Sequence, residues 1–121
     1  MAANELDMLD SFERSVQEAL DTLPSDIAAQ ISNLAVTVEG EPPPGQRLLG
    51  LYQGIPLTKR GAYYGYGGVL PDKITIYRNP LERLYGGDPA RLQAEIRRVV
   101  LHEIAHHFGI SDARLVEIDR Y

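Results

Sequence analysis

The sequence predicts a single α+β domain in which helices pack against three short strands. Apolar residues recur every three or four positions near both ends of the chain, and they alternate in short runs between those ends. The length of 121 residues is that of one domain, so we expect one unit over residues 1–121. With 44% hydrophobic and 24% charged residues, the chain has the composition of a folded protein rather than of a disordered one.

Two helices are expected in the first third of the chain. Apolar residues at helical spacing predict an amphipathic helix of about four turns that starts near Asn4. The apolar residues of this stripe, which we expect in the core, are Leu9, Phe12, Val16, Leu20 and Leu23. Pro24 ends the helix, and Ser25 is placed to cap a short second one.

Three strands are expected in the middle of the chain. Alternating apolar and polar residues predict the first strand over residues 34–39 and the second over residues 48–53. The third is predicted over residues 73–78, where Asn79 and Pro80 stop it. Between the last two strands, residues 60–68 hold four of the eleven glycines and three of the seven tyrosines.

A long helix is expected near the end of the chain. Asp88 followed by Pro89 is typical of a helix start, with an acid at the N-cap and proline at the first helical position. We expect this helix to run to about Phe108, with Gly109 as its left-handed stop. A last short helix is predicted over residues 112–119.

The second half of this long helix carries charged and polar groups where its pattern calls for apolar ones. The segment His102-Glu103-Ile104-Ala105-His106 is an HExxH motif. The two histidines are one turn apart on one face, so both imidazoles can reach one ion at ~2.0–2.1 Å. Glu103 can reach a water on that ion and take its proton. His107 points about 100° away, and we expect it to pack or to support the site.

The third metal ligand must come from another part of the chain. The sequence has no cysteine, which excludes a thiolate zinc site and leaves His, Asp and Glu as ligands. Gly109, three residues after His106, lets the chain reverse, and Asp112 can then bring its carboxylate to the ion. The alternative is that Asp112 only stabilises the first turn of the last helix, with Glu117 or Asp119 as the ligand.

The complete pattern, HExxHxxGxxD, resembles the zincin metallopeptidases and especially their metzincin-like branch, with Asp where metzincins carry a third His. The chain from Gly50 to Leu115 is similar to very small bacterial proteins regarded as candidate zinc metallopeptidases, the minimal zincins. The likeness is carried by GLYQGIPLTKR, YGYGGVLPDKITIYRNP and VVLHEIAHHFGISDARL. It implies a short mixed sheet over the HExxH helix, and Zn²⁺ bound by His102, His106 and Asp112.

The same resemblance implies hydrolysis of a peptide bond in a peptide or protein substrate, with Glu103 as the general base. In zincins the strand before the HExxH helix is a sheet edge that pairs with an extended peptide. This would give a substrate-binding role to Ile74, Thr75 and Ile76. Tyr64 and Tyr66 are further candidates for lining the substrate site, although tyrosines in such a stretch most often pack within the loop.

A departure from the metzincin pattern gives the alternative function. Metzincins have a methionine turn after the third ligand, whereas nine residues follow Asp112 here and the two methionines are Met1 and Met8. We therefore expect no methionine turn and little chain to form the lower half of a substrate cleft. The alternative is a non-catalytic, zinc-stabilised module that acts with a partner protein, and a partner could equally complete the cleft.

Charge and hydropathy indicate the expected surroundings of the protein. The net charge is −5, which is unlike the basic surface of a non-specific nucleic-acid binder. Residues 1–16 are acidic without an apolar run, unlike a secretory signal, and no stretch approaches the ~18 apolar residues of a membrane span. We therefore expect a cytoplasmic protein that has neither nucleic acid nor membrane as a partner.

Overall fold

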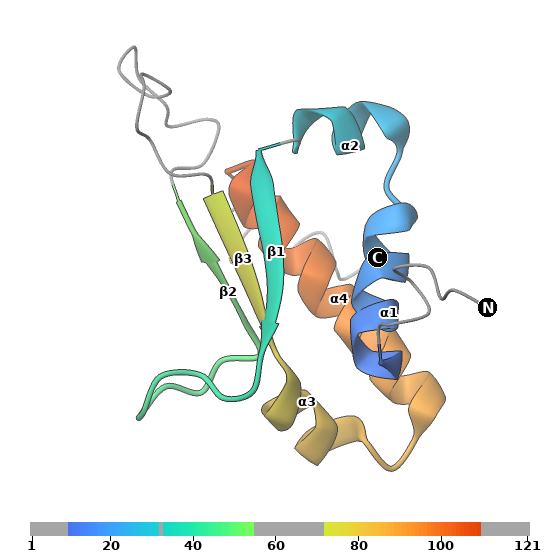
Figure 1. The fold of residues 1–121 in the computed structure, drawn as a ribbon, viewed down its shortest axis with the longest axis vertical. Coiled ribbons are helices and arrows are strands. Elements are labelled where there is room, and N and C mark those ends of the chain that lie inside the picture. The colour runs from blue at the N-terminus through green and yellow to red at the C-terminus, as the bar shows by residue number, and fades with distance from the viewer. Residues whose placement is uncertain (1–9, 32, 55–71, 110–121) are drawn as a thin grey trace, which may run out of the picture.

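The computed structural model describes residues 10–31, 33–54 and 72–109. These residues form a mixed α and β domain, as predicted (Figure 1). Its elements in chain order are α1 (Ser11–Asp21), α2 (Ser25–Gln30), β1 (Leu34–Glu39), β2 (Gly50–Gln53), β3 (Asp72–Tyr77), α3 (Arg78–Tyr85) and α4 (Pro89–His107). None of the helices described here is long and apolar enough to cross a membrane.

The three strands form one mixed sheet in the order β1-β3-β2. β1 runs parallel to β3 and pairs Val36 with Ile74, whereas β2 runs antiparallel and pairs Tyr52 with Ile74. β3 is therefore the central strand, and its backbone is hydrogen-bonded on both sides. Its side chains at Ile74, Thr75 and Ile76 are at most 1% exposed. The mixed sheet that the family resemblance implied is confirmed.

α4 lies between the sheet and α1, so it forms the middle layer of the domain (Figure 1). It packs against β2 and β3 on one side and against α1 on the other. The buried core joins all three layers, with Phe12 and Val16 from α1, Val100 and Ile104 from α4, and Ile76 from β3. A helix packed on two sides holds its side chains in fixed positions, which suits the element that carries the HExxH motif.

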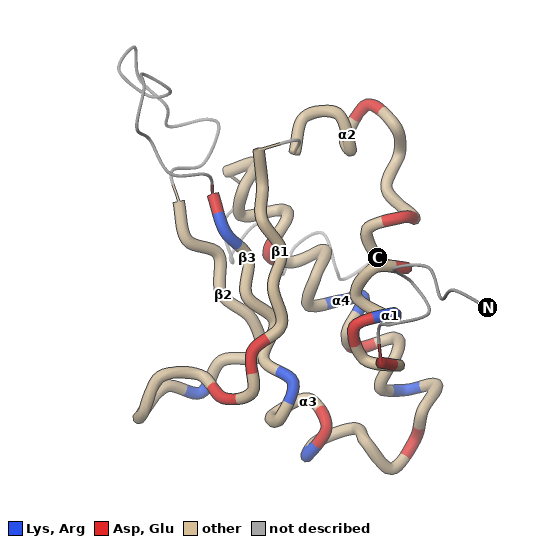
Figure 2. The backbone as a smooth tube through the Cα atoms, viewed as in Figure 1, with Lys and Arg blue, Asp and Glu red and all other residues tan. Residues whose placement is uncertain are grey.

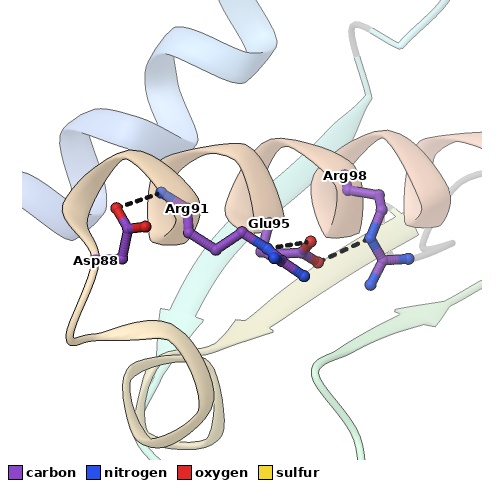
Figure 3. Close-up of polar contacts among 4 residues, drawn as sticks. All are labelled: Asp88, Arg91, Glu95 and Arg98. Atoms are coloured by element: carbon purple, nitrogen blue, oxygen red, sulfur yellow. Dashed lines mark hydrogen bonds and ion pairs between the residues drawn. The ribbon is translucent and has the colours of Figure 1, made fainter.

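The N-terminal half of α4 is fixed by local contacts along its surface (Figure 3). Asp88 caps the helix by accepting a hydrogen bond from the Arg91 backbone N–H at 3.2 Å. Glu95 then accepts from Arg91 Nε at 3.1 Å and from Arg98 Nε at 2.9 Å. Burial alone raises the pKa of the Glu95 carboxyl, but its bonds and charge contacts with both arginines lower the pKa overall. Figure 2 shows acidic and basic residues interspersed along this helix.

The ends of the predicted helices are confirmed at α4 and shifted at the first two helices. Gly109 has φ of +85°, the left-handed conformation expected of it. α1 begins at Ser11 rather than near Asn4, because the Asp10 side chain caps it by accepting from the Glu13 N–H at 2.8 Å. Ser25 is the first residue of α2 and makes no capping hydrogen bond, because Pro24 occupies the N-cap.

Sequence analysis missed one helix, α3, which begins directly after β3. The strand ends at Tyr77, one residue earlier than predicted, and Asn79 and Pro80 lie in the first turn of α3. Proline is tolerated there because the first N–H groups of a helix have no partner within it. Arg78, predicted as the last strand residue, starts this helix and lies with its guanidinium 5.0 Å from the centre of the Phe12 ring. The last predicted helix lies outside the described residues.

Candidate metal centre

Two histidines in the last turns of α4 direct their rings toward one another. The Nε2 atoms of His102 and His106 are 3.2 Å apart, and the ring planes meet at 73°. Both residues are half-buried. This convergence follows from the helix itself, because residues four apart lie one above the other on the same face.

The spacing of these two nitrogen atoms fits a shared metal ion. Tetrahedral zinc with Zn–N bonds of about 2.0–2.1 Å separates its ligand nitrogens by roughly 3.3 Å. The 3.2 Å between His102 Nε2 and His106 Nε2 is close to that separation. Imidazole nitrogen is also a preferred donor for zinc, so both the donor type and the geometry of the pair suit the ion.

The side chain of Glu103 is buried next to β2. Its side chain is 8% exposed and lies against Gly50, where an added Cβ atom would be 3.2 Å from Glu103 Cγ. The same Cβ atom would be 2.8 Å from Val99 Cγ1, which is too close for any residue larger than glycine without a shift. Gly50 therefore allows β2 to approach α4 beside the Glu103 side chain.

A second polar group, made of Tyr52, Asp72 and His107, lies at the end of α4. His107 and Asp72 are 2% and 1% exposed, and His107 Nδ1 is 2.8 Å from Asp72 Oδ2. The Tyr52 hydroxyl donates to the same Asp72 oxygen at 2.6 Å. Sequence analysis placed His107 in a packing or supporting role, included Tyr52 in the second strand and left Asp72 just before the third, with no role for either in a site. An acid at the start of an otherwise buried strand was the available signal.

A comparison of the sequence with models of known protein families identifies the family of this chain. The model of the family described as zincin-like metallopeptidase matches residues 26–121. The chain belongs to this zincin-like family. The match begins within α2 and includes the whole sheet and α4, so α1 lies outside it. No curated protein matches the sequence.

The described part of this zincin contains two of the three predicted metal ligands. Within residues 10–31, 33–54 and 72–109, no three His, Cys, Asp or Glu side chains form a group that could hold a metal ion. The predicted third ligand, Asp112, lies outside the described residues, and so do the alternatives Glu117 and Asp119. Its role as a ligand therefore stays a prediction, while Gly109 has the positive φ that the predicted chain reversal requires.

One prediction about substrate binding is corrected by the sheet of this zincin. Ile74, Thr75 and Ile76 were expected to lie on a sheet edge and to pair with a peptide. They lie instead on β3, whose two edges are occupied by β1 and β2, and their side chains are buried. The pairing of a peptide with this strand is therefore wrong. Tyr64 and Tyr66 lie outside the described residues.

Proposed function

We propose that this zincin is a zinc-dependent peptidase with His102, His106 and Asp112 as the metal ligands. The observation that carries the proposal is the 3.2 Å separation of the two Nε2 atoms in a chain that belongs to the zincin-like metallopeptidases. When bound, zinc would supply Lewis-acid activation of a water molecule and of the scissile carbonyl group.

Glu103 would move the proton in this reaction. Its carboxylate accepts the proton from the attacking water and delivers it to the nitrogen of the leaving amine. Its position next to His102 in sequence brings it near the ion, while its side chain faces β2. The low exposure of Glu103 keeps bulk water from its carboxylate, which strengthens its electrostatic interaction with the reacting groups.

The substrate would lie along β2 rather than β3. β2 is the outer strand on this side of the described sheet, and it packs directly on α4. An extended peptide can add to such an outer strand through backbone hydrogen bonds. Because Gly50 brings β2 against Glu103, a peptide on this strand would pass close to the general base.

Metal content and cleavage measured together test the proposal. We expect the purified chain to bind one zinc per molecule and to cleave unstructured peptides, with activity lost on chelation. The double variant His102→Ala with His106→Ala should lose both, whereas Arg97→Ala, an exposed site on the same helix, should lose neither. A folded double variant that retains stoichiometric zinc would overturn the assignment. Zinc binding that raises the melting temperature without cleavage would favour the non-catalytic module instead.

A further inference from the structure

The buried group of Tyr52, Asp72 and His107 has no part in the mechanism proposed above, yet it joins three elements. Tyr52 comes from β2, Asp72 is the first residue of β3, and His107 is the last residue of α4. The rings of Tyr52 and His107 also contact edge to face, with centres 5.8 Å apart. Asp72 and His107 are almost fully buried, and burying a carboxylate is costly unless it is hydrogen-bonded. The hydrogen bonds to Asp72 therefore hold these residues in place.

Of the two nitrogen atoms of the His107 ring, Nδ1 is the one that forms a hydrogen bond with Asp72. Asp72 Oδ2 also accepts from Tyr52, and a carboxylate oxygen only accepts, so the hydrogen on the His107 ring is assigned to Nδ1. His107 Nε2 is buried and meets no hydrogen-bond partner in the part of the chain that the structure describes. Asp72 is therefore the residue that fixes the direction of this ring.

The Asp72 carboxylate is itself tightly enclosed. Gly54, directly after β2, has φ of +154°, and a Cβ atom added there would collide with the Asp72 carboxylate. The absence of a side chain at Gly54 lets the backbone close over Asp72. With the Tyr52 hydroxyl donating to Oδ2, the carboxylate is held in one position.

The turn that this group holds is the one that carries His106. The backbone N–H of Phe108 donates to Ile104 and Ala105 at 3.2 and 3.1 Å, and that of Gly109 donates to His106 at 2.9 Å. These are the last bonds of α4, and a helix end opens more easily than its middle because no further turn supports it. His102 lies one turn earlier, so His106 is the member of the pair that depends on this end.

We propose that Asp72 is a positioning residue that acts through His107 to keep the last turn of α4 closed, and thereby keeps His106 directed at His102. This inference rests on the proposed zinc site. If the last turn opens, a smaller fraction of the molecules can bind zinc. The apparent dissociation constant for zinc then equals the intrinsic constant divided by that fraction, so it rises. Supporting contacts around metal sites typically change affinity by about 10–100-fold, and we expect a loss in that range.

Two substitutions at His107 separate the hydrogen bond from the mere presence of a polar side chain. In His107→Asn the amide nitrogen takes the place of Nδ1 and can still donate to Asp72. In His107→Gln the amide nitrogen takes the place of Nε2 and cannot. Zinc affinity, measured on the full chain by competition with a chromogenic chelator, should fall at least about tenfold in His107→Gln and recover most of the loss in His107→Asn.

A core variant distant from this group controls for a general loss of stability. Val16→Ala removes buried volume from α1 and should lower the melting temperature while leaving zinc affinity within about twofold of the wild type. Amide hydrogen exchange of the metal-free protein gives a second readout: Phe108 and Gly109 should exchange faster in His107→Gln but not in Val16→Ala. Should His107→Gln fail to fold, Asp72→Asn keeps an acceptor oxygen without the charge and should show a smaller loss of the same kind.

Each outcome decides between the positioning role and its alternatives. Zinc binding by His107→Gln as tight as that of the wild type would overturn the positioning role while leaving the zinc site intact. An equal loss of affinity in Val16→Ala would overturn it as well, because the effect would then be one of general stability. A wild-type chain that binds no zinc would overturn the proposed zinc site. Separately, amide hydrogen exchange at Phe108 and Gly109 that is unchanged in His107→Gln would show that His107 does not keep the last turn of α4 closed.

Discussion

Among single residues, Glu103 differs from the two histidines of its motif in what it faces. His102 and His106 face each other at the end of α4, whereas Glu103 faces Gly50 on β2. A residue that follows a ligand by one position is rotated by about 100° around the helix axis. That rotation keeps Glu103 near the proposed ion without placing it in line with the two imidazoles, which suits a base better than a ligand.

Replacing Glu103 by Gln should separate the two roles. We expect the variant to bind zinc as the wild type does, because no ligand is changed, and to lose cleavage by a factor of about 10² or more. Zinc content and the rate of peptide cleavage, measured on the same preparation, check this. Loss of metal as complete as in the histidine variants would show that Glu103 is a ligand and not the base.

The histidine pair could be predicted from the sequence because its geometry is local. Four positions along a helix bring His102 and His106 together in any fold that forms α4. The contact of His107 with Asp72 spans 35 positions and that with Tyr52 spans 55. Such contacts depend on how the strands pair and on where α4 crosses them, and no local pattern encodes this.

Among the elements, α4 and β2 form the contact that places Glu103 beside the outer strand. The contact depends on Gly50, because any side chain at this position would press on Val99 and Glu103. The start of α4 is set separately, by the Asp88 cap and the Arg91–Glu95–Arg98 contacts (Figure 3). Contacts between its own side chains therefore stabilise the start of the helix, and packing on β2 and β3 positions it toward the other end.

We expect Gly50→Ala to lower the free energy of unfolding by about 1–3 kcal/mol and to reduce cleavage, because β2 must move away from α4. Gly87→Ala is the matched control. Nothing lies within 4 Å of a Cβ atom at Gly87, so stability should stay within about 0.5 kcal/mol of the wild type. Urea unfolding of both variants provides the comparison. Equal stability of the two variants would mean that β2 does not need this close approach.

Helices and strands with strong local sequence signals were predicted, whereas the order of the strands in the sheet was not. The acid and proline at residues 88 and 89, together with Gly109, mark both ends of α4 correctly. α3 was missed because Pro80 was taken only as the end of a strand, although it is also compatible with a first helical turn. The central place of β3 depends on pairing with β1 and β2, which lie far from it in sequence, and the edge position that the zincin resemblance implied for this strand is wrong.

In the molecule as a whole, α1 covers the face of α4 that is turned away from the sheet (Figure 1). Buried apolar side chains hold most of this contact. Arg78 at the start of α3 also reaches Glu13 of α1 at 3.7 Å, in addition to one shorter ion pair. That pair is between Asp10 and Arg78, whose guanidinium also lies over the Phe12 ring. Because Arg78 directly follows β3, the pair links the outer helix to the end of the central strand.

This link makes the stability of the domain depend on pH through Asp10. The hydrogen bond from Arg78 is the largest cause that lowers the pKa of the Asp10 carboxyl below its ordinary value of 3.8. A carboxyl with a lowered pKa in the folded state stabilises that state above its ordinary pKa, and the contribution is lost as pH falls through the folded value. The Asp10 side chain is 45% exposed, so solvent screening keeps the contribution small, at most about 1 kcal/mol.

Asp10→Asn isolates the charge, because Asn is as good an N-cap as Asp and can still accept from the Glu13 N–H. At neutral pH we expect the variant to melt a few degrees below the wild type, in line with a loss of at most about 1 kcal/mol. Well below pH 3.8 the difference should vanish, because Asp10 is then protonated in the wild type as well.

Asp10→Ala should be less stable than Asp10→Asn at both pH values, since it also removes the cap. Melting curves of the three proteins at both pH values check this, and a difference between wild type and Asp10→Asn that persists in acid would mean that the Arg78 pair does not carry the effect.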